Sequence, residues 1–131
     1  AAPADARAAR LREAGDDRFL SAVLDTEAQI ALARGQLENA ASLAHRAIDL
    51  ARSSGNRGME LTAMLTEARA LRGTGDNPGA EHRYAEAADL ARSGHSAGRT
   101  REVLREWAAL RAETGNHRGA YELTSEALSV N

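Results

Sequence analysis

The apolar positions of the chain recur with helical spacing, in stretches of about four turns that contain no internal proline. Glycines separate these stretches at twenty-residue intervals, and His95, beside Gly94, occupies the one slot without glycine. Glycine at such positions is typical of a residue that ends a helix. The pattern therefore predicts an all-α chain with turns at Gly15, Gly35, Gly55, Gly75, His95 and Gly115. It places about seven helices near 4–14, 17–34, 37–53, 57–73, 78–93, 97–113 and 118–130.

A forty-residue period is superimposed on this pattern. The segments GQLENAA (35–41), GDNPGAE (75–81) and GNHRGAY (115–121) align, and IDLARSSG (48–55) parallels ADLARSGH (88–95). A pair of helices is therefore the repeating unit, and it occurs three times. The other positions that repeat are Leu24, Met64 and Leu104; Ala28, Ala68 and Ala108; Ala40, Ala80 and Ala120; and Ala47, Ala87 and Ala127.

The composition supports a helical core made of small side chains. The 131 residues are 43% hydrophobic but only 3% aromatic, and thirty of them are alanine. Such a core requires helices that approach one another closely, at about 8–10 Å between axes. The length suits one modest domain.

The glycine-rich stretch from Gly73 to Gly79 has a second interpretation, as a loop that cradles phosphate. Such a loop follows a buried strand and is completed by a lysine or a second strand. No β-branched run precedes Gly73, all seventeen basic residues are arginine, and the turn recurs elsewhere without the extra glycines. We therefore expect a turn between helices here, with no nucleotide or other cofactor and no enzymatic activity.

The repeated positions resemble the tetratricopeptide repeat. Leu24, Ala28, Gly35, Ala40 and Ala47 match its pattern in the first unit, and the residues forty and eighty positions later match it in the others. The usual unit has 34 residues; the longer unit is similar to repeats in bacterial, especially actinobacterial, transcription regulators. The resemblance implies a right-handed superhelical stack of three hairpins preceded by one helix. Glu27 and Glu67 depart from the pattern, because an apolar residue is common there.

The resemblance also sets the expected domain organisation. The whole chain, 1–131, is expected to be a single repeat domain of a longer protein. Residues 1–15 would form a helix of a preceding unit, and the three units would span 16–55, 56–95 and 96–131.

Charge and composition narrow the expected partners. The net charge is −2 with acids and arginines intermixed, so we expect no direct binding to nucleic acid. No apolar run is long enough to span a membrane, and the absence of cysteine fits a cytoplasmic protein. Glu81, His82 and Glu86 suggest a metal or acid–base cluster, but no paired-histidine spacing occurs, which favours surface histidines and no metal site.

In tetratricopeptide arrays the first helices of the units line a concave groove that binds peptides. A family clamp for chaperone tails needs lysine and asparagine where Asp25 and Gln29 stand, so that partner is not expected. Arg69, Arg72 and Arg105 are predicted to hold an acidic group of a protein or peptide. The competing interpretation is an ordinary solvated helix face, with Glu102 and Glu106 as neutralising neighbours. The predicted groove residues are Asp25, Gln29, Leu65, Arg69, Arg72, Glu102 and Arg105.

These features predict a binding module rather than an enzyme. The leading hypothesis is the partner- or ligand-sensing region of a bacterial regulator. The alternative is a structural module that self-assembles by stacking through its terminal hairpins, which would make it a homo-oligomer.

Overall fold

The computed structural model describes the backbone of residues 3–131 and the side chains of residues 16–131. Within that range the chain is all-α, as the sequence predicts, and contains six helices and no strand. The helices are α1 (Pro3–Ala33), α2 (Leu37–Ser53), α3 (Arg57–Thr74), α4 (Asn77–Ser93), α5 (Ala97–Glu113) and α6 (His117–Ser129).

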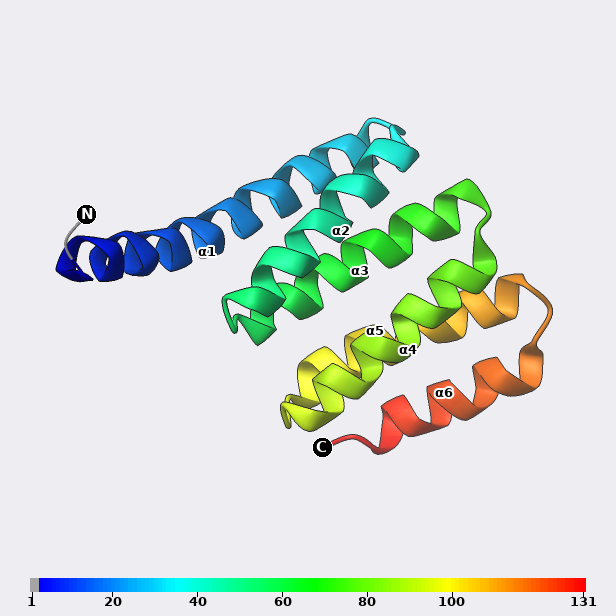
Figure 1. Cartoon of the computed structure of the whole chain (residues 1–131). Helices are drawn as coiled ribbons and strands as arrows, with labels where there is room; N and C mark the ends of the chain where they lie inside the picture. Colours follow the sequence, from blue (N-terminus) through cyan, green and yellow to red (C-terminus); the bar gives the residue numbers. More distant parts are fainter. Residues whose placement is uncertain (1–2) are drawn as a thin grey trace.

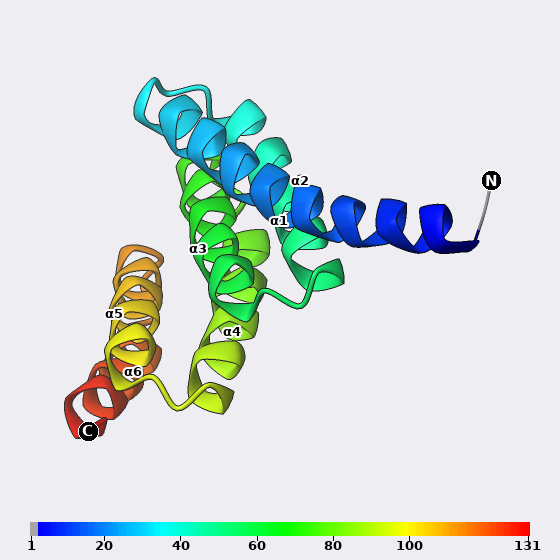
Figure 2. The ribbon, with the colours of Figure 1, turned by 90° about the vertical axis from the view of Figure 1, so that its left-hand side faces the viewer.

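The helices stack in chain order. Consecutive helices are antiparallel, and each packs against the one before and the one after (Figure 1). Helix α1 also contacts α3. The N-terminal half of α1 projects beyond the other helices, as both Figure 1 and Figure 2 show.

The predicted turn at Gly15 is wrong. Helix α1 runs without interruption from Pro3 to Ala33, so residues 4–14 and 17–34 form one helix and the chain has six helices instead of about seven. A glycine inside a helix costs only about 1 kcal/mol relative to alanine. Extending an existing helix adds a hydrogen bond per residue without a new nucleation step.

The other five turns share one conformation. The residues at 35, 55, 75, 95 and 115 all have positive φ, between 57° and 87°. In the four glycine turns the next residue donates its N–H back to a carbonyl five residues earlier, as Asn56 does to Ala51 at 2.9 Å. The residue after each of the five turn positions is the N-cap of the following helix. Its side chain caps that helix after the turns at 55, 75, 95 and 115, through Asn56, Asp76, Ser96 and Asn116.

His95 confirms that the twenty-residue slot demands a left-handed residue. Its φ is 57°, and it is the only non-glycine residue with positive φ in the described backbone. Histidine tolerates this conformation better than β-branched residues do. The His95 side chain is exposed, so the turn requires the left-handed backbone of this residue but not its imidazole ring.

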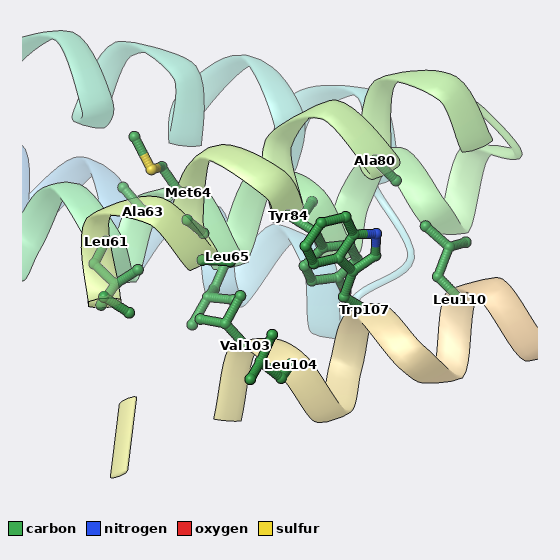
Figure 3. Close-up of a cluster of buried hydrophobic side chains, with 14 of the residues drawn as sticks. Leu61, Ala63, Met64, Leu65, Ala80, Tyr84, Val103, Leu104, Trp107 and Leu110 are labelled. Atoms are coloured by element: carbon green, nitrogen blue, oxygen red, sulfur yellow. The ribbon is translucent and has the colours of Figure 1, made fainter. Parts of the chain in front are cut away.

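The core consists mainly of alanines at the repeated positions. Ala28, Ala40 and Ala47 of the first unit are completely buried, and so are their counterparts in the second unit. Ala108 and Ala127 remain buried in the third unit. Larger side chains fill the space between the helices, and Figure 3 shows those from α3, α4 and α5. The members of this group are Leu61, Met64, Leu65, Tyr84, Val103, Leu104, Trp107 and Leu110.

We expect Ala68→Leu to destabilise the fold, because Ala68 is completely buried where two helices cross. Overpacking such a site costs roughly 1–3 kcal/mol in free energy of unfolding. Ala108→Leu should act in the same direction. Chemical denaturation measures the change, and Ala109→Leu, one residue further on an exposed position, is the control. Equal stability of the Ala68 variant and the control would show that the alanine register is misassigned.

Candidate functional site

The first helices of the three units, α1, α3 and α5, carry the predicted groove residues. Two of these residues are buried instead of lining a groove. Leu65 is 2% exposed and belongs to the main hydrophobic cluster. Asp25 is also 2% exposed, and its carboxylate accepts a hydrogen bond from the Gln29 side-chain amide at 2.7 Å. Gln29 itself is exposed, so it remains available at the surface.

Arg69 bridges α3 and α5. Its guanidinium donates two hydrogen bonds to the Glu106 carboxylate, from Nε at 2.9 Å and from an Nη atom at 2.5 Å. The Tyr84 hydroxyl of α4 donates a third to the same carboxylate at 3.2 Å. One carboxylate on α5 thus ties three helices together. Such bidentate arginine pairs are shorter and stronger than neutral hydrogen bonds.

Arg72 makes a second bridge between the same two helices. Its Nε donates to the Glu113 carboxylate at 3.0 Å, and an Nη atom donates to the other carboxylate oxygen. This hydrogen bonding lowers the pKa of Glu113 and raises that of Arg72. The Glu113 side chain is 58% exposed, so the pair lies at the solvent boundary.

Glu102 and Arg105 do not pair with each other. Glu102 accepts a hydrogen bond from Arg99 at 3.0 Å, and Arg99 also donates to the Thr62 hydroxyl on α3 at 2.7 Å. Arg105 is exposed, and none of the described carboxylates lies within 4.0 Å of its guanidinium. Of the three arginines predicted to converge on an anion, two are therefore engaged by carboxylates and one is free.

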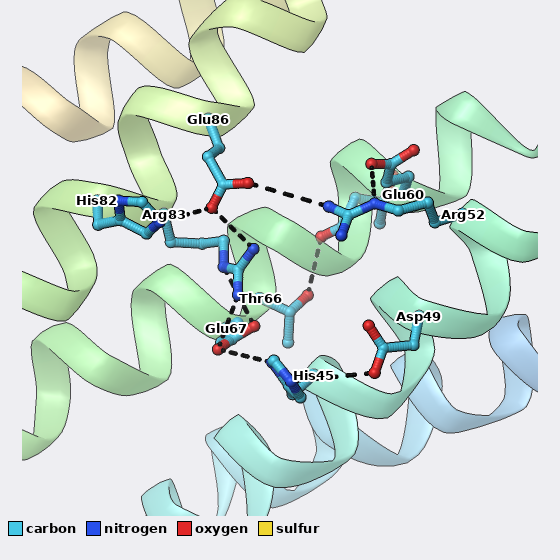
Figure 4. A network of polar contacts seen from close by, with 10 residues as sticks. His45, Asp49, Arg52, Glu60, Thr66, Glu67, His82, Arg83 and Glu86 are labelled. Atoms are coloured by element: carbon cyan, nitrogen blue, oxygen red, sulfur yellow. Dashed lines mark hydrogen bonds and ion pairs between the residues drawn. The ribbon is translucent and has the colours of Figure 1, made fainter.

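A second polar network links α2, α3 and α4 on the side of the second helices (Figure 4). At its centre is Glu67, which is 7% exposed. Arg83 of α4 reaches its carboxylate at 3.3 Å, and His45 of α2 reaches it at 3.4 Å. Arg83 also donates to Glu86 at 3.0 Å. The Glu67 carboxylate is thus compensated by the Arg83 guanidinium of α4 and lies against the His45 imidazole of α2; a buried carboxylate requires such a paired charge.

Sequence reasoning missed most of these interhelical pairs. A signal for one class was present, because Arg52 and Arg92 are forty residues apart, as are Glu86 and Glu126. Arg52 reaches Glu86 at 3.9 Å between α2 and α4, and Arg92 reaches Glu126 at 2.7 Å between α4 and α6. An arginine and a glutamate that repeat together with the same separation predict a contact between successive second helices.

One hollow of the surface lies beside the Arg52–Glu86 pair. It has a volume of about 420 Å³, lies between α2, α3 and α4, and is lined by Arg52, Glu60, Met64, Glu86 and Leu90, among others. His82 lies 3.0 Å from Glu86, whereas Glu81 is paired with Arg111 at 2.7 Å. No three His, Cys, Asp or Glu side chains among those described are grouped to hold a metal ion.

Comparisons with protein-family models, with curated proteins and with solved structures give no match for this chain. Within the described residues, no helix combines the length and the apolar character that crossing a membrane requires. The candidate site is therefore defined by its own geometry. It is the solvent-facing side of α1, α3 and α5, where Gln29 and Arg105 are exposed beside the bridges made by Arg69 and Arg72.

Burial and the charge of Glu106 raise the pKa of Tyr84 to about 12. Between pH 10 and 12 the folded chain retains a proton that the unfolded chain releases, so the free energy of unfolding should fall as pH rises, by at most about 1.4 kcal/mol per pH unit. Tyr84→Phe should remove this fall. Denaturation at pH 8 to 12 measures it, and the absence of lysine keeps competing titrations few.

Tyr121→Phe is the matched control for this measurement, because Tyr121 is 73% exposed. Its pH dependence should equal that of the unmodified chain. A Tyr84→Phe variant that loses stability as steeply as the parent between pH 10 and 12 would contradict the assignment.

Proposed function

We propose that the chain is a protein- or peptide-binding module of the tetratricopeptide type, a right-handed superhelical stack of three hairpins. In this proposal it is the partner- or ligand-sensing region of a bacterial transcription regulator in the cytoplasm. It acts by binding, without a cofactor and without enzymatic chemistry. The support is the repeat itself, since the forty-residue sequence period recurs in the buried alanines and in the left-handed turns.

The binding face is the exposed side of α1, α3 and α5. The observation that carries this assignment is Arg105, an exposed cation without a nearby described carboxylate, next to the Arg69–Glu106 bridge. Arg105 offers a planar fork of donors that suits a carboxylate. The preferred partner therefore carries an acidic group, and Gln29 on α1 supplies an amide for its backbone or side chains.

The neighbouring bridges set how an acidic partner is accepted. The Arg69 side chain is 39% exposed and its partner Glu106 is 23% exposed. Ion pairs with such access to water contribute about 0–1 kcal/mol. An incoming carboxylate can thus share Arg69 at modest cost, whereas Glu106 repels an acid that approaches from the wrong side. The face therefore discriminates between positions of the acidic group.

The test is selection of peptides from a random displayed library on the immobilised chain, followed by affinity measurements at low and high salt. The selected peptides should be enriched in acidic residues and should bind more weakly at high salt, because charge pairs at a solvated surface are screened. Arg105→Glu should weaken their binding by about tenfold or more, as expected from reversing one charge in a paired contact.

Arg118→Glu is the control, because Arg118 is a 91% exposed arginine on α6, away from the proposed face. It should bind the selected peptides like the parent chain. If the peptides lack acidic residues, or if Arg105→Glu binds them as tightly as Arg118→Glu does, the proposed face is wrong.

A further inference from the structure

The exposed large hydrophobic side chains in the described part of the chain are confined to the two terminal helices. Phe19, Leu20 and Ile30 lie on α1, and Tyr121 and Leu128 lie on α6. None lies on α2, α3, α4 or α5. The apolar surface is therefore concentrated at the two ends of the stack.

The forty-residue register shows what is missing at the α6 end. Leu128 is 79% exposed, whereas its counterparts Ile48 on α2 and Ala88 on α4 are 1% and 0% exposed. Thr124 is likewise exposed, and its counterparts Ala44 and Tyr84 are completely buried. Helices α2 and α4 bury this face because α3 and α5 pack against them. In the described structure no helix packs on the same face of α6.

The α1 end lacks the complementary half. Ile30 is 48% exposed, but its counterparts Ala70 on α3 and Leu110 on α5 are 0% and 1% exposed. Ala70 clusters with Ala40 of the preceding helix α2. In the same register, Leu110 and Ala80 of the preceding helix α4 belong to one hydrophobic cluster, which Figure 3 shows. In the described structure no second helix precedes α1, so the face that would meet one stays open.

The two open faces are thus the two halves of an interface that the chain forms twice internally, as α2 against α3 and as α4 against α5. We propose that α6 of one copy packs against α1 of a second copy, so that the chain associates head to tail. The partner is a second copy of this chain, because its α1 is equivalent in register to α3 and α5. Within one copy, α3 and α5 cover the same face of α2 and α4 that is open on α6. Such an interface is heterologous and does not close on itself in a dimer, so it extends into a row of copies.

Glu27 weakens this interface between α6 of one copy and α1 of the next, which we call the joint. In α3 the equivalent Glu67 is buried between Arg83 and His45, and in α5 the equivalent residue is Trp107. At the joint the position equivalent to His45 is Ser125, which supplies a hydroxyl and no charge. A carboxylate next to a neutral partner opposes burial, so the association is weak and depends on concentration. Glu27→Leu should tighten it by about tenfold or more.

Sedimentation equilibrium of the 131-residue chain over a wide concentration range tests the proposal. The average mass should rise above the 13.9 kDa of one chain as concentration increases. Leu128→Glu and Ile30→Glu should each weaken the association by about tenfold or more, because each places a charge in the joint. Both positions are exposed in the single chain, so circular dichroism should show unchanged helix content.

A mixing experiment distinguishes the head-to-tail joint from a symmetric dimer. Leu128→Glu chains keep an intact α1 face, and Ile30→Glu chains keep an intact α6 face. An equimolar mixture of the two should therefore form a 1:1 complex with the affinity of the parent joint, and the complex should grow no further. In a symmetric dimer through either face alone, one of the two variants would self-associate like the parent.

Ser42→Glu, which adds a charge at an exposed position of α2, is the control and should associate like the parent. A chain that remains at 13.9 kDa at every concentration overturns the proposal. It is also overturned if Leu128→Glu associates like Ser42→Glu, or if the mixture of the two end variants stays monomeric while the parent chain associates.

Discussion

The close approach of neighbouring helices, which the small alanine side chains permit at the repeated positions, is the constraint on which the structure depends. Ala28 and Ala68 lie on the first helices of their units, and Ala47 and Ala87 lie on the second helices. All four are completely buried. A core so poor in aromatic residues gains its apolar burial from many short contacts between helices rather than from a few large side chains. The twenty-residue turns serve this packing, because each returns the chain at the length that brings the alanines into register.

Arginine connects the stack beyond nearest neighbours. Arg69 and Arg72 join α3 to α5, and Arg52 and Arg92 join α2 to α4 and α4 to α6. A guanidinium presents a rigid fork that fits a carboxylate two helices away, and it stays charged at any relevant pH. The same residue type that stabilises the repeat therefore also forms the proposed binding face. In that proposal, a partner with an acidic group would meet arginines that Glu106 and Glu113 already orient.

Local signals in the sequence predict most of this fold. The helices α2 to α6 begin and end within about one residue of the expected bounds, because each turn has a left-handed residue and four of the five turns have a capping side chain after it. Gly15 has the spacing of the other turns, but α1 continues through it. The candidate site is harder to predict. Arg69 and Arg72 were expected to face an anion, but Glu106 and Glu113 lie 37 and 41 residues later and reach them only because the fold brings α5 within side-chain reach of α3. Leu65 was wrongly predicted to line the groove. The first helices bury more of their surface than they would if one whole side of each were open to a groove.

The interchangeability of the units is the central claim, and deletion of one unit in register tests it most directly. Removing residues 56–95 joins Gly55 to Ser96, which preserves a left-handed residue followed by a cap and brings α5 onto α2 in place of α3. Removing residues 56–75 joins Gly55 to the cap Asp76 with equally good local signals, but it places α4 against α2, out of register. Thermal unfolding followed by circular dichroism should show a helical, cooperatively folded chain for the in-register deletion and a loss of cooperativity for the other, although the other is twenty residues longer. Equal behaviour of the two deletions would contradict the repeat account.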